Sequence, residues 1–237
     1  MEKDRLWEID ALRGIAISAM IAFHFLFDLN YFGSLGWKIG QGGWWIFARS
    51  IALTFILLVG ISLTLSYNRN RRSLAHYTRR GLKIFSWGLL ITAVTWIFLK
   101  EGTIYFGILH FIGLSIILAY PFLARRKSAF VVGLLALFAG IVMMEKRVQT
   151  YSLLWLGIAP SNFYTFDYFP LFPWFGYVLF GIFIGNSLYK NGKRHYRLPD
   201  FSKMKVIKFL SFLGRNSLLL YLIHQPISIA LVLAIIG

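Results

Sequence analysis

Long apolar runs, separated by short polar connections, alternate along the whole chain. A transmembrane helix needs about 20 residues to cross the ~30 Å hydrocarbon core of a bilayer, and each run is close to that length. The pattern therefore predicts an all-α fold, a polytopic transmembrane helix bundle of about seven spans that forms a single domain over residues 1–237. The predicted spans cover residues 9–30, 44–67, 80–99, 104–123, 128–145, 169–188 and 213–236.

The composition supports a membrane location. Of the 237 residues, 58% are hydrophobic and 18% aromatic, which is more than the interior of a soluble domain of this size holds. A formal net charge of +16 could suggest nucleic-acid binding, but only 14% of the residues are charged and the basic ones cluster between apolar runs. We therefore expect contact with membrane lipids and no nucleic-acid partner. The absence of cysteine excludes disulfides and thiolate metal ligands.

Lysine and arginine are concentrated in every second connection between the predicted spans. The connections 68–83, 124–127 and 189–208 are strongly basic, whereas those between them carry few cations. Because short basic loops remain on the cytoplasmic side, this alternation predicts a cytoplasmic N-terminus and an external C-terminus. An amphipathic stretch over residues 203–214 (KMKVIKFLSFLG) is expected to lie at the membrane interface before the last span.

Polar side chains are costly inside a membrane, and the predicted spans contain three histidines and the acid Asp28. His24 and Asp28 are four residues apart and share a helix face, so the carboxylate could accept from one imidazole nitrogen and leave the other as a base. Packing of His24 in the core, with Asp28 at the interface, is the structural alternative. His110 and His224 lie at comparable depth, and each alone is more often structural than catalytic. No metal site is predicted, because no His-x-x-Glu or paired-carboxylate spacing is present.

Several arginines and a lysine lie near the ends of the predicted spans. Arg13 follows Asp10 by three residues, which allows an intrahelical ion pair. Arg49 either extends toward the headgroups or meets an acyl carbonyl or an acceptor hydroxyl.

Another basic cluster opens the third predicted span from the inner side. Its members are Arg79, Arg80 and Lys83. They are either ordinary cytoplasmic charge or a phosphate site for a cytosolic nucleotide-like ligand.

Seven segments follow one another along nearly the whole chain: IDALRGIAI, AFHFLFDLNYF, FILLVGIS, RRGLKIFSWG, GILHFIGLS, the glycine-rich sixth span and GRNSLLLYLIHQP. In this order they resemble the heparan-α-glucosaminide N-acetyltransferase catalytic-domain family, within the broader transmembrane acyltransferase superfamily. The resemblance implies transfer of an acetyl group from cytosolic acetyl-CoA across the membrane to an acceptor on the far side. It maps the family's histidine to His24, the arginine of its third-span motif to Arg80, and its ending to Asn216 and His224.

These observations predict a multi-pass acyltransferase of the cell membrane, with acetyl-CoA as cosubstrate and a hydroxyl or amine acceptor, most simply a sugar. His24 would be the base or acyl carrier, and His110, Arg49 or Asn216 would stabilise the oxyanion. The candidate catalytic residues are His24, Asp28, Arg49, His110, Asn216 and His224, and the candidate cofactor-binding residues are Arg13, Arg79, Arg80 and Lys83. A homodimer is left open. The alternative is a small-solute transporter or lipid flippase in which the same histidines and acid form a proton relay.

Overall fold

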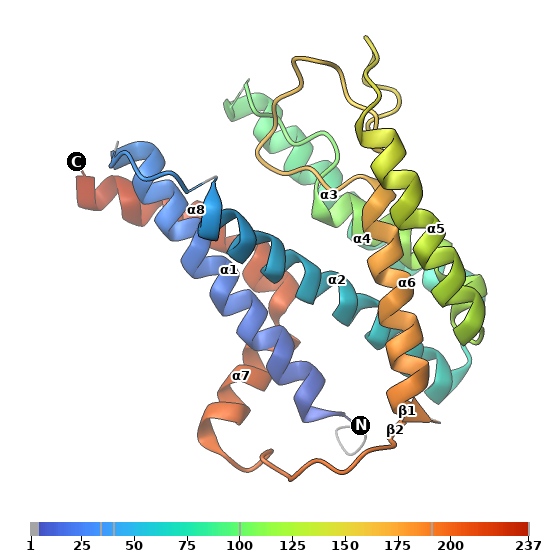
Figure 1. Cartoon of the computed structure of the whole chain (residues 1–237). Coiled ribbons are helices and arrows are strands. Elements are labelled where there is room, and N and C mark those ends of the chain that lie inside the picture. The colour runs from blue at the N-terminus through green and yellow to red at the C-terminus, as the bar shows by residue number, and fades with distance from the viewer. Residues whose placement is uncertain (1–4, 34, 40, 100, 191, 237) are drawn as a thin grey trace. The chain divides into compact units, whose positions relative to one another are not determined.

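The computed structural model describes residues 5–33, 35–39, 41–99, 101–190 and 192–236. The helices within these residues, in chain order, are α1 (Trp7–Gly33), α2 (Gly42–Asn70), α3 (Leu74–Leu99), α4 (Ile108–Leu118), α5 (Arg126–Met144), α6 (Leu171–Leu188), α7 (Lys205–Arg215) and α8 (Ser217–Ile236) (Figure 1). A 3-10 turn (Tyr120–Phe122) follows α4, and the strands β1 (Tyr189–Lys190) and β2 (Lys193–Arg194) form a small antiparallel hairpin. The predicted all-α fold is confirmed.

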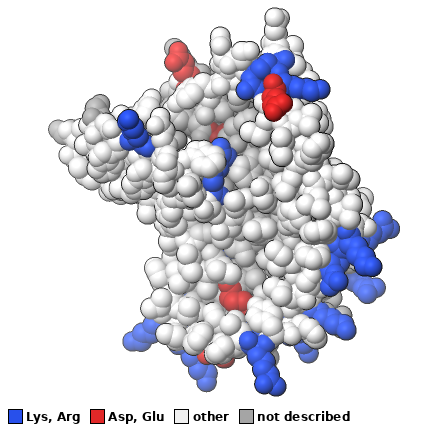
Figure 2. Space-filling view, viewed as in Figure 1, with Lys and Arg blue, Asp and Glu red and all other residues white. Residues whose placement is uncertain are grey.

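Six of the described helices are long and apolar enough to cross a membrane: α1, α2, α3, α5, α6 and α8. They correspond to six of the predicted spans. Figure 2 shows that most of the visible surface is uncharged. The amphipathic stretch before the last span also folds as expected, because it forms α7.

The fourth predicted span, 104–123, differs from the prediction. Its helix α4 has only 11 residues, which corresponds to ~16 Å at 1.5 Å per residue. The chain before α4 is held in a turn, because Ile104 N donates to Thr95 Oγ1 (3.1 Å) and Ile104 O accepts from Thr92 Oγ1 (2.5 Å). These two bonds to α3 replace the helical bonds that Ile104 would otherwise make, so the helix begins later than the hydropathy pattern indicates.

The chain divides into two compact units, and the division falls within α2, between Phe55 and Ile56. The first unit contains α1, the first part of α2, α7 and α8. The second unit contains the rest of α2, then α3 to α6 and the hairpin.

In the first unit, α1 packs against both α7 and α8 (Figure 1). Two glycines let the backbones of α1 and α7 touch. A Cβ on Gly14 would overlap the carbonyl oxygen of Leu210, and a Cβ on Gly214 would overlap the carbonyl oxygen of Asp10. The IDALRG and GRNS segments, about 200 residues apart in the sequence, therefore meet in this contact.

In the second unit, glycines also set the closest helix contacts, as is common between membrane helices. A Cβ on Gly181 of α6 would overlap the carbonyl oxygen of Leu57 in α2. One turn later, a Cβ on Gly185 would lie 3.0 Å from Thr64 Cβ. Residue numbers therefore rise in the same direction along both helices, so α2 and α6 run parallel. By the same comparison, α3 and α4 run antiparallel, because Gly81 contacts Gly113 while Gly88, further along α3, contacts His110. The glycine-rich faces thus serve helix packing.

The connection between α5 and α6 is long but folded. Tyr168 Oη donates to the carbonyl of buried Leu154 (2.8 Å), and Thr165 Oγ1 donates to Thr103 O (2.8 Å). Burial raises the pKa of Tyr168 to about 12, so its hydroxyl stays protonated and able to donate. Asp167 Oδ2 accepts from Ile108 N (2.9 Å) and so caps the start of α4, where a carboxylate is favourable.

Candidate active site

Two histidines from opposite ends of the sequence meet in the first unit. His24 Nδ1, on α1, lies 2.7 Å from His224 Nε2, on α8. The ring planes are inclined by 18° and the ring centroids are 4.9 Å apart, which fits a nearly in-plane N–H···N bond. His224 is buried and His24 is half-buried. The two histidines that the sequence indicated on the first and last spans therefore form a direct pair.

The hydrogen bonds of this pair define which nitrogen carries each proton. His224 Nδ1 lies 2.6 Å from the carbonyl oxygen of Tyr221, and a carbonyl only accepts, so this nitrogen carries hydrogen. Nε2 of neutral His224 is then the acceptor, and His24 Nδ1 donates to it. This assignment leaves the lone pair of His24 on Nε2. The arrangement gives His24 an unprotonated nitrogen that can act as a base.

Asp28 does not play the predicted part of holding the His24 ring. Its Oδ1 accepts from Gln225 Nε2 (2.8 Å) and its Oδ2 accepts from Ser228 Oγ (2.5 Å), and its side chain is buried. Both donors come from α8, so Asp28 joins α1 to α8 about one turn beyond the histidine pair. His224 lies at His24 Nδ1, where the four-residue spacing predicted Asp28.

The first turns of α2 add aromatic rings to this unit. Phe23, next to His24, packs against Trp44 (centroids 6.4 Å apart) and Phe47 (6.2 Å). Arg49 lies with its guanidinium carbon 5.5 Å from the centroid of Trp45. Arg49 therefore belongs to the same unit as the histidine pair and is placed by a cation–π contact.

His110 has a different environment in the second unit. It is only 2% exposed, its Nδ1 accepts from Gly107 N (3.2 Å), and its Nε2 lies 3.3 Å from Thr92 Oγ1. Because Thr92 donates its own hydrogen to Ile104 O, the Nε2–H of His110 donates to Thr92. Both ring nitrogens are thus engaged by protein groups, and the ring joins the start of α4 to α3.

Other predicted residues make local contacts. Arg13 Nη1 lies 3.3 Å from Asp10 Oδ1, which confirms the intrahelical ion pair. Asn216 Nδ2 donates to Phe212 O (2.9 Å) at the junction of α7 and α8. The three cations of the α3 cluster, all exposed and in the second unit, are Arg79, Arg80 and Lys83.

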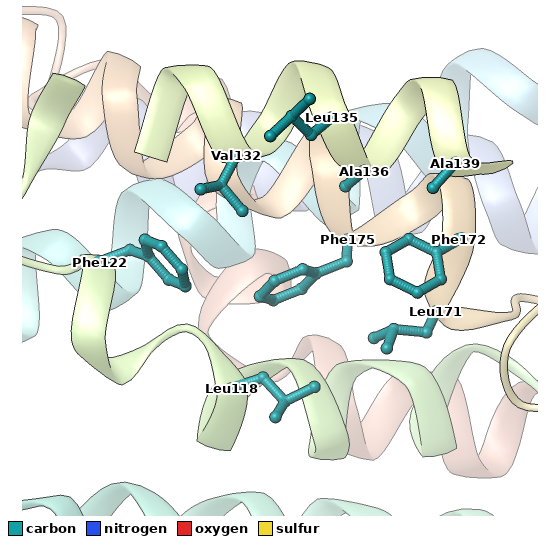
Figure 3. Close-up of a pocket in the computed structure, with 9 residues that line it drawn as sticks. All are labelled: Leu118, Phe122, Val132, Leu135, Ala136, Ala139, Leu171, Phe172 and Phe175. Carbon is teal, nitrogen blue, oxygen red and sulfur yellow. The ribbon is translucent and has the colours of Figure 1, made fainter. Parts of the chain in front are cut away.

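A cavity in the second unit is apolar, and the described residues hold no cluster of metal ligands. Among the described residues, no group of three or more His, Cys, Asp or Glu side chains is placed to hold a metal ion. A cavity of about 420 Å³ lies between α4, α5 and α6. Figure 3 shows that only hydrocarbon side chains line it, among them Leu118, Val132 and Phe175. Such a lining offers no group for acid–base chemistry.

The sequence did not predict the partners that α8 supplies to α1. Gln225, Ser228 and the Tyr221 carbonyl are ordinary groups in an apolar segment, and nothing local distinguishes them. One signal was available, because His224 and Ser228 repeat the four-residue spacing of His24 and Asp28. Two helices that run parallel, side by side, bring such equal spacings into register.

Comparison with known proteins places this arrangement in a family. Residues 5–226 match the family described as "Heparan-alpha-glucosaminide N-acetyltransferase, catalytic". No curated protein and no solved structure matches the chain. Because an enzyme family covers nearly the whole chain, the transporter alternative is set aside. The chain belongs to the heparan-α-glucosaminide N-acetyltransferase catalytic-domain family, whose members are acetyl-CoA-dependent transmembrane acetyltransferases, and it is a multi-pass membrane protein.

Proposed function

We propose that the chain acts as one catalytic domain and transfers the acetyl group of cytosolic acetyl-CoA to a hydroxyl or amine, of the sugar class, on the extracytoplasmic side. His24 Nε2 is the base. The observation that carries this proposal is the hydrogen-bond chain from the Tyr221 carbonyl through His224 to His24, which leaves one imidazole nitrogen with a lone pair. His224 holds the tautomer and orientation of His24, as the orienting member of a nucleophile–base–orienter set does.

In the direct reaction, the acceptor oxygen or nitrogen attacks the thioester carbonyl carbon while its proton moves to His24 Nε2. The C–S bond of the tetrahedral intermediate then breaks. The leaving thiolate takes the proton from His24, so that CoA leaves as the thiol and His24 returns to its neutral form. In the relay form of the reaction, His24 Nε2 itself attacks the thioester carbonyl carbon, the C–S bond breaks and CoA leaves as the thiolate. The acceptor then attacks the acetyl carbon, the bond to His24 Nε2 breaks, and the acceptor's proton passes to the thiolate, so that His24 returns to its neutral form.

Of the three groups considered for the oxyanion, we propose Arg49. Its guanidinium lies on the first turns of α2, in the same unit as the histidine pair. His110 has both nitrogens engaged, and Asn216 directs its amide hydrogen to Phe212 O. A well-placed donor to the oxyanion contributes roughly 3 kcal/mol to the barrier reduction.

We further propose seven crossings, with the short α4 segment as the fourth. In the second unit α2 and α6 run parallel, which requires an odd number of crossings between them. Those crossings are α3, α4 and α5. In the first unit α1 and α8 also run parallel, since His24 pairs with His224 and Asp28 with Ser228. Parallel first and last spans place the two termini on opposite sides, in agreement with the cytoplasmic N-terminus that the basic loops predict.

The proposal is tested with the purified full chain, acetyl-labelled CoA and a glucosamine-containing acceptor. The wild type is expected to transfer label to the acceptor. His24→Ala should lower kcat by about 10²–10⁴, and free imidazole should restore part of the rate because it can replace the missing base. His195→Ala removes an exposed histidine as a matched control and should keep the wild-type rate. Full activity of His24→Ala, or no consumption of acetyl-CoA by the wild type, would refute the proposal.

A further inference from the structure

A polar cavity lies at the end of the first unit where α1 begins. Its volume is about 320 Å³, and the start of α1 and the polar face of α7 line it. Three cations border it, namely Arg5, Lys208 and Arg215. This is a different basic region from the α3 cluster, and the sequence pattern alone gave no reason to separate it from ordinary cytoplasmic charge.

The α7 residues of the cavity share one stripe of the helix. Lys208, Ser211 and Arg215 follow one another at spacings of three and four, which places them on one face. Val206 and Phe209 are 63% and 61% exposed on another face. An amphipathic helix with this division lies at the membrane interface, with its apolar face in lipid and its basic face toward water.

The cavity is positive and holds a donor that needs an acceptor. Among the described residues that line it, the one acid is Asp10, which pairs with Arg13. Trp7 lines the cavity, and its Nε1–H is buried with no hydrogen-bond partner among the described residues. The three cations and the indole N–H together fit a phosphate group.

We propose that this cavity binds the phosphates of acetyl-CoA, an inference that rests on the proposed acetyl transfer. Arg5, Lys208 and Arg215 hold the phosphate oxygens, and the pantetheine arm extends from there along α8. Arg215 directly precedes the junction with α8, and His224 lies seven residues into that helix, or ~10 Å from its start. The arm has the backbone length of four to five extended residues, about 15 Å, so its thioester reaches the level of His224.

Binding of adenosine 3′,5′-bisphosphate, which carries the nucleotide end without the arm, tests the site without turnover. The purified chain in a neutral detergent is compared with Lys208→Ala, with Lys208→Ala/Arg215→Ala and with Lys205→Ala, a matched control on the same helix outside the cavity. Each cavity variant should raise Kd about tenfold or more per cation lost, and Lys205→Ala less than about twofold. If Lys208→Ala/Arg215→Ala does not fold, the comparison of Lys208→Ala with Lys205→Ala is sufficient.

A kinetic measurement provides a second, independent test of the cavity. With acetyl-CoA, Lys208→Ala should raise KM by a similar factor and leave kcat unchanged, whereas with acetyl-pantetheine it should behave as the wild type does. Equal Kd values for Lys208→Ala and Lys205→Ala would overturn the inference. A loss of bisphosphate binding in Arg80→Ala but not in Lys208→Ala would also overturn it. So would a loss of binding in Lys208→Ala that is seen only in vesicles containing an anionic phospholipid. If the wild type binds the bisphosphate but never transfers acetyl, the proposed function is refuted while the phosphate site stands.

Discussion

The histidine pair of the first unit and the single histidine of the second unit start from similar sequence contexts and reach opposite states. His24 and His110 each lie in an apolar segment at comparable predicted depth. His110 has a donor or an acceptor on each ring nitrogen, supplied by Gly107 and Thr92. His24 shares one nitrogen with His224 and keeps a lone pair on the other. The number of engaged ring nitrogens, more than depth in the membrane, therefore separates a catalytic candidate from a structural histidine.

The same substitution at both sites gives the largest expected contrast. His24→Gln should lower kcat by about 10²–10⁴ while the melting temperature stays near that of the wild type, because only the base is lost. His110→Gln should change kcat in the folded protein by less than about threefold and lower the melting temperature, since buried donors lose their partners. Initial rates and thermal unfolding of the two variants check this contrast. A severe kcat defect in a well-folded His110→Gln would contradict the contrast between His24 and His110.

Removal of the acceptor behind His24 should have an intermediate effect. His224→Phe keeps a ring of similar size but cannot accept from His24 Nδ1, so kcat should fall about 10- to 100-fold with little change in KM. His224→Gln supplies an oxygen acceptor and should recover part of that loss.

The pH profile separates positioning from simple packing at His224. If His224 orients the base, the ionisation seen in kcat/KM should shift in His224→Phe and return toward the wild-type position in His224→Gln. Identical profiles in all three proteins would assign His224 a structural role and remove the distinction between the pair and His110.

The smallest effect is expected at the hydroxyl that completes the His110 environment. Thr92→Val keeps the shape of the side chain but removes the group between His110 Nε2 and Ile104 O. Stability should fall by about 1–3 kcal/mol, with kcat unchanged, because a buried donor and acceptor lose their partner. Denaturant or thermal unfolding beside a rate assay measures both quantities. A change in kcat larger than the change in stability would contradict a structural role for this site.

Much of the fold was predictable because membrane helices follow from length and hydropathy. Six predicted spans correspond to long helices, and the amphipathic stretch forms α7. The start of α4 was not predictable, since Ile104 is held by side chains of α3 and such bonds leave no trace in a hydropathy pattern.

The candidate site was half predictable. His24, Asp28 and His224 stood out because polar groups are costly within an apolar span. Their partners did not follow, because a four-residue spacing suggested a bond between His24 and Asp28 on one helix. In the structure α8 supplies partners to both, and its residues lie about 200 positions away.

The sequence by itself determined that this protein is a helical membrane protein and which few polar residues lie in its apolar segments, because the cost of polar groups in lipid acts locally on each segment. Only the tertiary structure decided which of these residues touch. Close packing through Gly14 and Gly214 joins α1 to α7, and the contacts of α1 with α8 bring His24 against His224. Hydrogen bonds depend on distances of about 3 Å between groups far apart in the chain, and helix packing alone sets those distances.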